Sequence, residues 1–145
     1  MTIFIIDNPI TTASILDKKR FNKQIIECQW MINMAEGRTK ESHHPAYLMY
    51  KDHIEWVKLY KKCFGEYRKN NFNEAKRYSE EAGKIRPAFL TPKLYNNFKK
   101  RLYEKDPEYY KLFEHHGKTN ANYYYVNGQW LKYEDGKKYI VDEIE

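Results

Sequence analysis

A chain of 145 residues with 41% hydrophobic content is long enough to bury one core, and it holds no apolar stretch of the roughly 18 residues that a membrane span needs. The net charge of +6 and the 17% aromatic share favour a nucleic-acid partner, although a basic protein without a polyanionic partner fits the charge equally well. The opening apolar run is too short for a signal peptide, and the isolated Cys28 and Cys63 fit a reducing cytoplasm.

The N-terminal quarter of the chain predicts a short apolar run and a long helix. Residues 3–6 favour either a strand or an extended N-terminus that lies on a helical core. The helix is expected over residues 13–36, because Gly37 can stop it and three nearby hydroxyl residues can cap it, namely Thr11, Thr12 and Ser14. Its core-facing positions recur at three- and four-residue steps: Phe21, Ile25, Cys28, Ile32 and Ala35.

The middle of the chain predicts four further helical segments, over residues 45–69, 72–84, 92–105 and 106–113. Ser42-His43-His44 before Pro45 is typical of a helix start with proline in the first turn. Asn70-Asn71 interrupts the pattern after the first of these segments.

The C-terminal tail predicts a small antiparallel sheet. Residues 123–126 and 129–133 flank Asn127-Gly128, which is the strongest hairpin signal in the chain. Asp135-Gly136 then precedes residues 137–141, so a three-stranded meander can form. The expected fold class is therefore mainly α, a compact single-domain helical bundle with a small C-terminal β-hairpin or meander.

The stretch over residues 16–27 carries an electrostatic conflict. Lys18, Lys19 and Arg20 stand in its first helical turn, where the helix terminus already carries partial positive charge, so these cations cost stability. We therefore expect them to be held for an external anion.

Glu27 is the first candidate for chemistry. It lies seven residues after Arg20 and three after Gln24, so the three side chains project from one helix face. A carboxylate in that setting can act as a general acid or base, or stabilise a developing cation. The alternative is a helix-surface glutamate paired with Lys23, and spacing alone favours that alternative.

Thr2 is the second candidate. Its small side chain permits removal of Met1 in a cell, which exposes an α-amine. With a pKa near 7.8, about 10–15% of such an amine is unprotonated at pH 7, against on the order of 0.04% of a free lysine. It is therefore suited to attack a sugar C1′ and form an imine, whereas a retained Met1 would block it.

No metal site is expected, because the five histidines form two adjacent pairs and one single residue that no cysteine or carboxylate completes. The stretches 99–105 and 109–111 interleave cations with tyrosines, which can neutralise phosphates and support a displaced base. A solvated helix face with packed tyrosines explains the same pattern equally well.

Several of these pieces agree in order and spacing with one family. Thr2, the helix with Arg20, Phe21, Gln24 and Glu27, and the stretches 101–105 and 109–113 resemble the pyrimidine-dimer DNA glycosylases of the phage endonuclease V type. Cellular-type members are similar around residues 16–27, 44–46 and 105–110. The resemblance covers residues 1 to about 117. Ile25 and Ile26 stand where relatives tend to place a cation, so one phosphate contact is expected to be missing.

The resemblance implies a helical glycosylase-like domain over residues 1–117, with residues 118–145 as a Tyr-rich extension packed on it, and neither metal nor cofactor. It implies a DNA-repair glycosylase with associated AP-lyase activity on cyclobutane pyrimidine dimers in duplex DNA. In that activity the Thr2 amine attacks C1′, Glu27 stabilises the imine, and β-elimination breaks the strand 3′ to the lesion. The DNA-binding residues that it implies are Lys19, Arg20, Lys23, Gln24, Arg101, Lys105, Tyr109, Tyr110 and Lys111.

Two other functions stay open from the sequence. One is the same imine chemistry on another lesion, such as an oxidised or ring-opened base. The other is a non-catalytic DNA-binding module on the same scaffold. A monomer is expected in each case, because the helices can bury their own apolar faces. The expected location is the cytoplasm.

Overall fold

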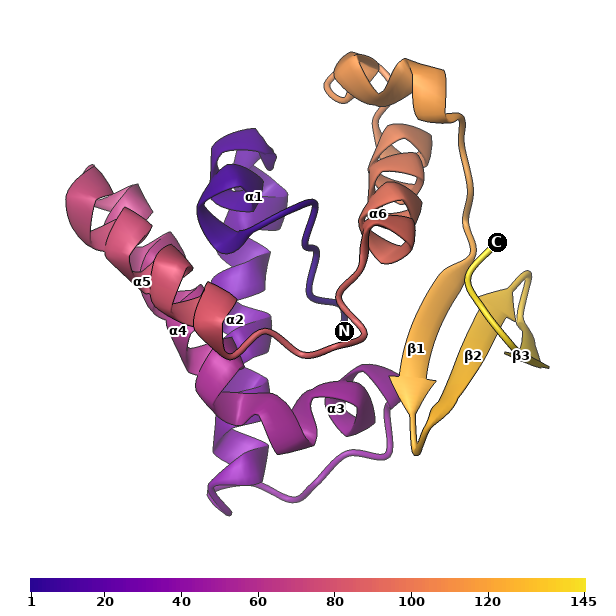
Figure 1. The fold of residues 1–145 in the computed structure, drawn as a ribbon, viewed down its shortest axis with the longest axis horizontal. Coiled ribbons are helices and arrows are strands. Elements are labelled where there is room, and N and C mark those ends of the chain that lie inside the picture. The colour runs from indigo at the N-terminus through magenta and orange to yellow at the C-terminus, as the bar shows by residue number, and fades with distance from the viewer. The chain divides into compact units, whose positions relative to one another are not determined.

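Six α-helices and one three-stranded sheet make up the regular structure of the chain (Figure 1). The computed structural model describes all residues, 1–145, which divide into unit 1 (Met1–Ala88) and unit 2 (Phe89–Glu145). Unit 1 contains α1 (Pro9–Ile15), α2 (Lys18–Ala35), α3 (Pro45–Tyr50), the 3-10 helix η1 (Lys51–His53), α4 (Ile54–Arg68) and α5 (Phe72–Lys84). Unit 2 contains α6 (Pro92–Lys105), the 3-10 helix η2 (Lys111–His116), β1 (Asn122–Val126), β2 (Gln129–Glu134) and β3 (Lys137–Val141). The expectation of a mainly α chain with a C-terminal meander is confirmed.

The first predicted helix is two helices, because Leu16 and Asp17 adopt extended conformations between α1 and α2. Asn8 caps α1, where the sequence predicted a hydroxyl residue. The Asp17 carboxylate caps α2: it accepts from the Arg20 backbone N–H at 3.4 Å and from the Arg20 guanidinium at 3.1 Å. The prediction of one helix over residues 13–36 is therefore wrong at its start. The negative charge of Asp17 offsets part of the repulsion between the helix N-terminus and the cations of the first turn.

The end of α2 follows the prediction. Gly37 has a φ of +76°, which a residue without a Cβ adopts at no steric cost. Its N–H donates to the Met34 carbonyl at 3.2 Å, and the Arg38 N–H donates to the Asn33 carbonyl at 2.9 Å. These two bonds form a Schellman motif that satisfies carbonyls at the helix end.

The second predicted helix, over residues 45–69, is interrupted. It begins at Pro45 as expected, with the His44 side chain as the cap, but η1 separates α3 from α4. The predicted bounds 72–84 and 92–105 are confirmed as α5 and α6. The predicted helical turn over residues 106–113 starts too early, because Asp106 ends α6 and residues 107–110 form turns before η2 begins.

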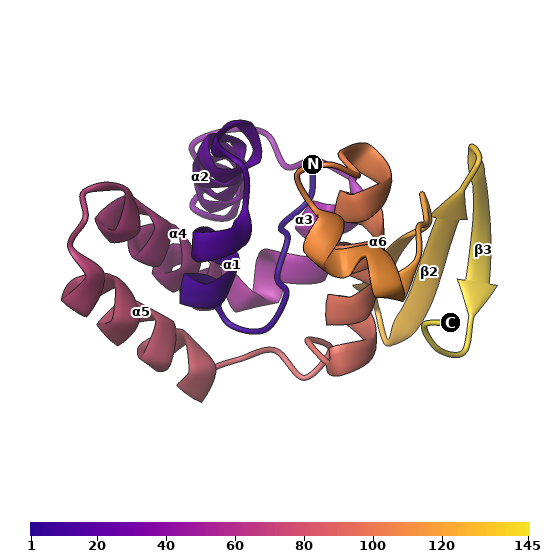
Figure 2. The same cartoon turned by 90° about the horizontal axis from the view of Figure 1, so that it is seen from above.

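The core of unit 1 is built around α4, which packs against α5, α2 and α1 (Figure 2). A column of aromatic rings joins α4 to α2 and α3, with successive centroids between 4.4 and 5.6 Å apart: Phe21, Phe64, Tyr60, Trp56 and Tyr50. Stacked and tilted rings at such distances are favourable beyond the area that they bury. The column therefore holds α2 at a fixed position on α4.

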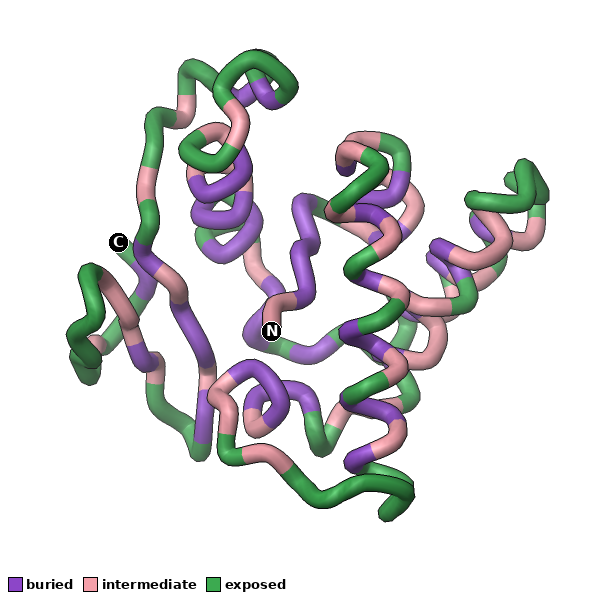
Figure 3. The backbone as a smooth tube through the Cα atoms, turned by 180° about the vertical axis from the view of Figure 1, so that it is seen from behind, coloured by how far each residue is buried: buried purple, intermediate pink, exposed green.

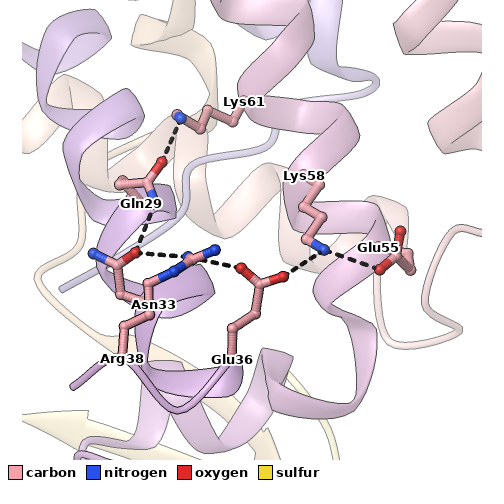
Figure 4. Close-up of polar contacts among 7 residues, drawn as sticks. All are labelled: Gln29, Asn33, Glu36, Arg38, Glu55, Lys58 and Lys61. Carbon is pink, nitrogen blue, oxygen red and sulfur yellow. Dashed lines mark hydrogen bonds and ion pairs between the residues drawn. The ribbon is translucent and has the colours of Figure 1, made fainter. Parts of the chain in front are cut away.

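A polar network joins the same two helices nearer the end of α2 (Figure 4). Lys61 donates to Gln29, whose amide donates in turn to Asn33 at 2.8 Å. Glu36 accepts from Lys58 at 2.9 Å and pairs with Arg38 at 2.7 Å. These contacts lie at the surface and add little stability singly, but they oppose rotation of α2 about its axis.

Residues 3–6 are extended and buried, and they belong to no sheet (Figure 3). The alternative of an extended N-terminus on a helical core is thus confirmed over the alternative of a strand. Because this segment covers one side of α2 and α4 covers another, the buried stripe of α2 is wider than predicted. Phe21, Cys28 and Ile32 are buried as expected, whereas Ile25 is half-buried and the expectation for Ala35 is wrong, since it is exposed.

Unit 2 packs η2 against α6 and carries the antiparallel meander, in the order β1-β2-β3. Both turns have the positive φ values that two-residue hairpins need: 51° and 77° at Asn127-Gly128, and 51° and 75° at Asp135-Gly136. The predicted hairpin is confirmed, and its register places Tyr125 opposite Trp130. The domain boundary predicted between residues 117 and 118 falls between η2 and β1. The division into two domains at this point stays a prediction.

Candidate active site

The backbone nitrogen of Thr2 and the carboxylate of Glu27 form the centre of the candidate site. The Thr2 nitrogen donates to Glu27 Oε2 at 2.7 Å, and Glu27 is only 3% exposed. Lys23 Nζ lies 3.9 Å from the other carboxylate oxygen, Oε1, and is itself exposed. The pairing with Lys23 exists, but the interpretation of Glu27 as a surface glutamate is wrong. A buried carboxylate is expensive unless it is paired and hydrogen-bonded, and here the nitrogen of residue 2 supplies the short hydrogen bond.

Gln24 fixes the N-terminal segment beside Glu27. Its Nε2 donates to the Thr2 carbonyl at 3.0 Å, and its Oε1 accepts from the Phe4 N–H at 2.8 Å. These two bonds reproduce the pairing that a neighbouring strand would offer an extended segment. Gln24 was predicted to contact DNA, but its side chain is 2% exposed and its amide is occupied in this way.

Tyr60 of α4 contacts both the N-terminal segment and Gln24. Its hydroxyl lies 2.6 Å from the Phe4 carbonyl oxygen and 3.0 Å from Gln24 Oε1, both of which are acceptors. Burial raises the pKa of Tyr60 well above its ordinary value, so the hydroxyl keeps its proton and acts as a donor. Sequence reasoning did not single out Tyr60, and the one signal available was that a buried tyrosine hydroxyl needs a partner.

His44 is a further residue near the N-terminus that the sequence assigned only to a helix start. Its Nδ1 accepts from the Ala46 N–H at 3.1 Å, which caps α3. Burial, and then the positive charge of the N-terminal amine, lower the pKa of His44. The imidazole is therefore neutral near pH 7.

The two cysteines are not available as nucleophiles. Burial raises the pKa of Cys28 far above its usual range, with a smaller contribution from the adjacent negative charge of Glu27. Burial also raises the pKa of Cys63 to about 12. Both thiols therefore stay protonated.

The predicted DNA-binding residues of α2 differ in exposure. Lys19 and Lys23 are exposed, whereas Arg20 is half-buried and its guanidinium pairs with Asp17 at 3.1 Å. Lys19 and Lys23 thus lie on the exposed side of the helix whose inner side bears Glu27.

The predicted DNA-binding residues of unit 2 are split between interior and surface. Arg101 and Tyr110 are buried, whereas Lys105, Tyr109 and Lys111 are exposed. Tyr109 packs edge-on against Tyr110, with 4.9 Å between ring centroids. The exposed members are thus two cations and one aromatic ring at the end of α6 and the start of η2.

No group of three or more His, Cys, Asp or Glu side chains is placed to hold a metal ion. None of the helices combines the length and hydrophobicity that crossing a bilayer requires.

A family model described as pyrimidine dimer DNA glycosylase matches residues 1–79, which is more than half of the chain. The matched region contains Thr2, Gln24, Glu27, His44 and Tyr60, and thus the whole arrangement around the N-terminus. No curated protein and no solved structure matches the chain.

The matched family is one of DNA-repair enzymes of the glycosylase class, whose substrate is DNA. The chain belongs to the pyrimidine dimer DNA glycosylase family. The match ends before the stretches 101–105 and 109–113, so the resemblance noted there stays a prediction.

Proposed function

We propose that the chain excises cyclobutane pyrimidine dimers from duplex DNA as a glycosylase with associated AP-lyase activity, through an imine on the nitrogen of residue 2. The observation that carries the proposal is the 2.7 Å contact between that nitrogen and the buried Glu27 carboxylate. Removal of Met1 turns this nitrogen into a primary α-amine. A neighbouring carboxylate can then accept the proton that the amine loses on attack.

The reaction balances with groups of this chain and water. The amine attacks C1′ of the damaged nucleoside, the C1′–N bond breaks, and the pyrimidine leaves with the electron pair and gains a proton. Opening of the sugar at the C1′–O4′ bond then gives a protonated imine, whose positive charge lies next to Glu27. Loss of a proton from C2′ breaks the C3′–O3′ bond and cuts the strand 3′ to the attacked sugar, and hydrolysis of the imine releases the enzyme.

The burial of Glu27 favours catalysis over a DNA-binding module without activity. Placing a carboxylate where it is 3% exposed costs free energy, and binding of a polyanion gains nothing from a negative charge. The same carboxylate would stabilise the protonated imine that forms beside it. The hydrogen bond from residue 2 offsets part of this cost, and a reaction that passes through a positively charged intermediate gives the buried carboxylate a further role.

For DNA binding we propose Lys19, Arg20 and Lys23 on α2, with Lys105, Tyr109 and Lys111 in unit 2. Gln24, Arg101 and Tyr110 support these surfaces from inside. Duplex binding then weakens steeply with salt, since each neutralised phosphate releases counterions. The enzyme acts where the DNA is, within the cell.

Borohydride trapping tests the proposal directly. Protein from cells is first checked by intact mass for loss of Met1, then incubated with an irradiated duplex and with an abasic-site duplex. We expect a covalent adduct at residue 2 with both. No adduct with either duplex would falsify the imine mechanism, and an adduct with the abasic duplex alone would mean lyase activity on a different lesion.

A pair of variants at residue 2 provides the matched control. Thr2→Ala keeps a small side chain and so permits removal of Met1, and we expect it to form the adduct. Thr2→Leu has a large side chain, so it retains Met1 and is expected to form none. Equal trapping by both variants would place the reacting nitrogen elsewhere.

A further inference from the structure

The exposed face of α2 carries cations and apolar side chains but no carboxylate. The exposed residues that share this face are Lys19, Lys23, Ile26 and Trp30, whereas Lys18 and Ala35 are exposed on other sides of the helix. The one carboxylate within the helix, Glu27, is turned inward to the Thr2 nitrogen. This face therefore offers positive charge at one end and apolar surface at the other.

Trp30 stands out on this face, because its side chain is left in water. It is 51% exposed and Ile26, one turn before it, is 50% exposed, whereas Trp56 of α4 is 2% exposed. The Trp30 indole takes part in no hydrogen bond and no ring stacking. Tryptophan is among the more buried residue types on average, and neighbouring exposed apolar residues often mark a contact surface.

The position of Trp30 relative to Glu27 follows from helix geometry. Residues three apart on a helix have Cβ atoms about 5–6 Å apart, so Trp30 lies one turn beyond Glu27. Bases of one strand are spaced about 3.4 Å along the duplex axis. A nucleotide whose sugar reaches Thr2 and Glu27 therefore brings bases one or two steps away within reach of the indole.

We propose that Trp30, flanked by Ile26, stacks on a base of the damaged duplex next to the reacting nucleotide and so contributes to recognition of the lesion. The inference rests on the proposed function of the Thr2–Glu27 site. Apolar side chains commonly enter weakened base steps, and a dimer distorts stacking at its own position. The indole replaces the stacking that the duplex loses there.

The charge of the face identifies the partner as nucleic acid. An apolar protein partner would have to cover Lys19 and Lys23, whose only nearby carboxylate is that of Glu27, 3.9 Å from Lys23. A DNA strand meets both requirements, because its phosphates neutralise Lys19 and Lys23 while its bases present flat apolar surfaces. The lysines of this face therefore match the phosphates of a DNA strand, and the indole matches one of its bases.

The test compares affinities for a duplex with one cyclobutane thymine dimer and for the undamaged duplex of the same sequence. Base–aromatic stacking lost on substitution by alanine weakens binding by roughly 5- to 150-fold. We expect Trp30→Ala to lose affinity in that range for the dimer duplex and much less for the undamaged one. Trp30→Phe should recover most of the preference, since a phenyl ring also stacks.

Two further variants make the test specific. Trp30→Lys places a cation at the same position. If charge attraction alone explained binding, this variant would bind as well as the wild type or more tightly. If stacking explains it, the variant loses the preference for the dimer duplex. Phe72→Ala removes another half-exposed aromatic ring, at the start of α5, and should leave the preference unchanged. Thermal unfolding checks that each variant is folded.

The inference is overturned if Trp30→Ala keeps the wild-type preference, if Trp30→Lys restores it, or if Phe72→Ala loses it to the same extent. A change in oligomeric state without a change in DNA affinity would also overturn it, because the face would then bind another copy of the chain. Failure of the proposed function is seen separately, as the absence of a borohydride adduct in the wild-type protein, and the affinity ratio is measured independently of that adduct.

Discussion

Replacing Glu27 with glutamine removes one charge from the site and almost nothing else. The substituted side chain has nearly the same shape, and its amide can turn so that the oxygen still accepts from the Thr2 nitrogen, as the carboxylate Oε2 does at 2.7 Å. The lost ion pair with Lys23 spans 3.9 Å to an exposed ammonium, so it contributes less than about 1 kcal/mol to stability. We therefore expect the folded structure and the affinity for DNA to be preserved.

The same substitution should remove most of the turnover. Glutamine can neither accept a proton from the amine nor balance the charge of the imine. General acid–base catalysis by one positioned group is worth roughly 10²- to 10⁴-fold, so we expect the single-turnover rate to fall by at least about 100-fold. Cleavage of an end-labelled dimer duplex under enzyme excess measures this rate, and a gel-shift titration measures the affinity.

Glu36→Gln provides the control for loss of one carboxylate charge, at the C-cap of α2. Glu36 follows the same helix but pairs with Lys58 and Arg38, away from Thr2, so its substitution should leave the rate unchanged (Figure 4). A wild-type rate in the Glu27 variant, or an equal loss in both variants, would refute the assignment of the proton-transfer role to Glu27.

Three further substitutions test how the site is held together. Tyr60→Phe leaves the Phe4 carbonyl without its 2.6 Å donor in the core, so the free energy of unfolding should fall by about 1–3 kcal/mol in urea titrations; no change would mean that water replaces the hydroxyl. Asp17→Ala removes the cap of α2 and should lower stability by about 0.5–2 kcal/mol, while Asp17→Asn recovers part of it. His44 has a lowered pKa in the folded state, so the unfolded chain binds the proton more tightly and stability falls as pH drops below about 6.5. In His44→Asn, which keeps a capping oxygen, melting temperatures measured from pH 7 to pH 5 should show a weaker dependence; an unchanged profile would assign it to another group.

Local chemistry allowed the sequence to predict much of the fold. Helix ends at Gly37, Pro45, Asn71 and Pro92 follow from the conformations that these residues accept or forbid, and the two Gly-containing turns define the meander. The errors are also local. The chain breaks at Leu16 and Asp17 because the Asp17 carboxylate caps a new helix, and periodicity continues across that break without a signal.

The site itself could be only partly predicted. The sequence identified Thr2 and Glu27 as groups of suitable chemistry, but the spacing along α2 equally fitted a glutamate at the surface. What decides the matter is a contact across 25 residues, in which the extended N-terminal segment lies over Gln24 and Glu27 and buries them. Helical periodicity reports which residues share a face, and it cannot report which of two faces another segment will cover. The tertiary structure therefore decided that the carboxylate lies against the nitrogen of residue 2, whereas the sequence by itself determined the helices that carry it.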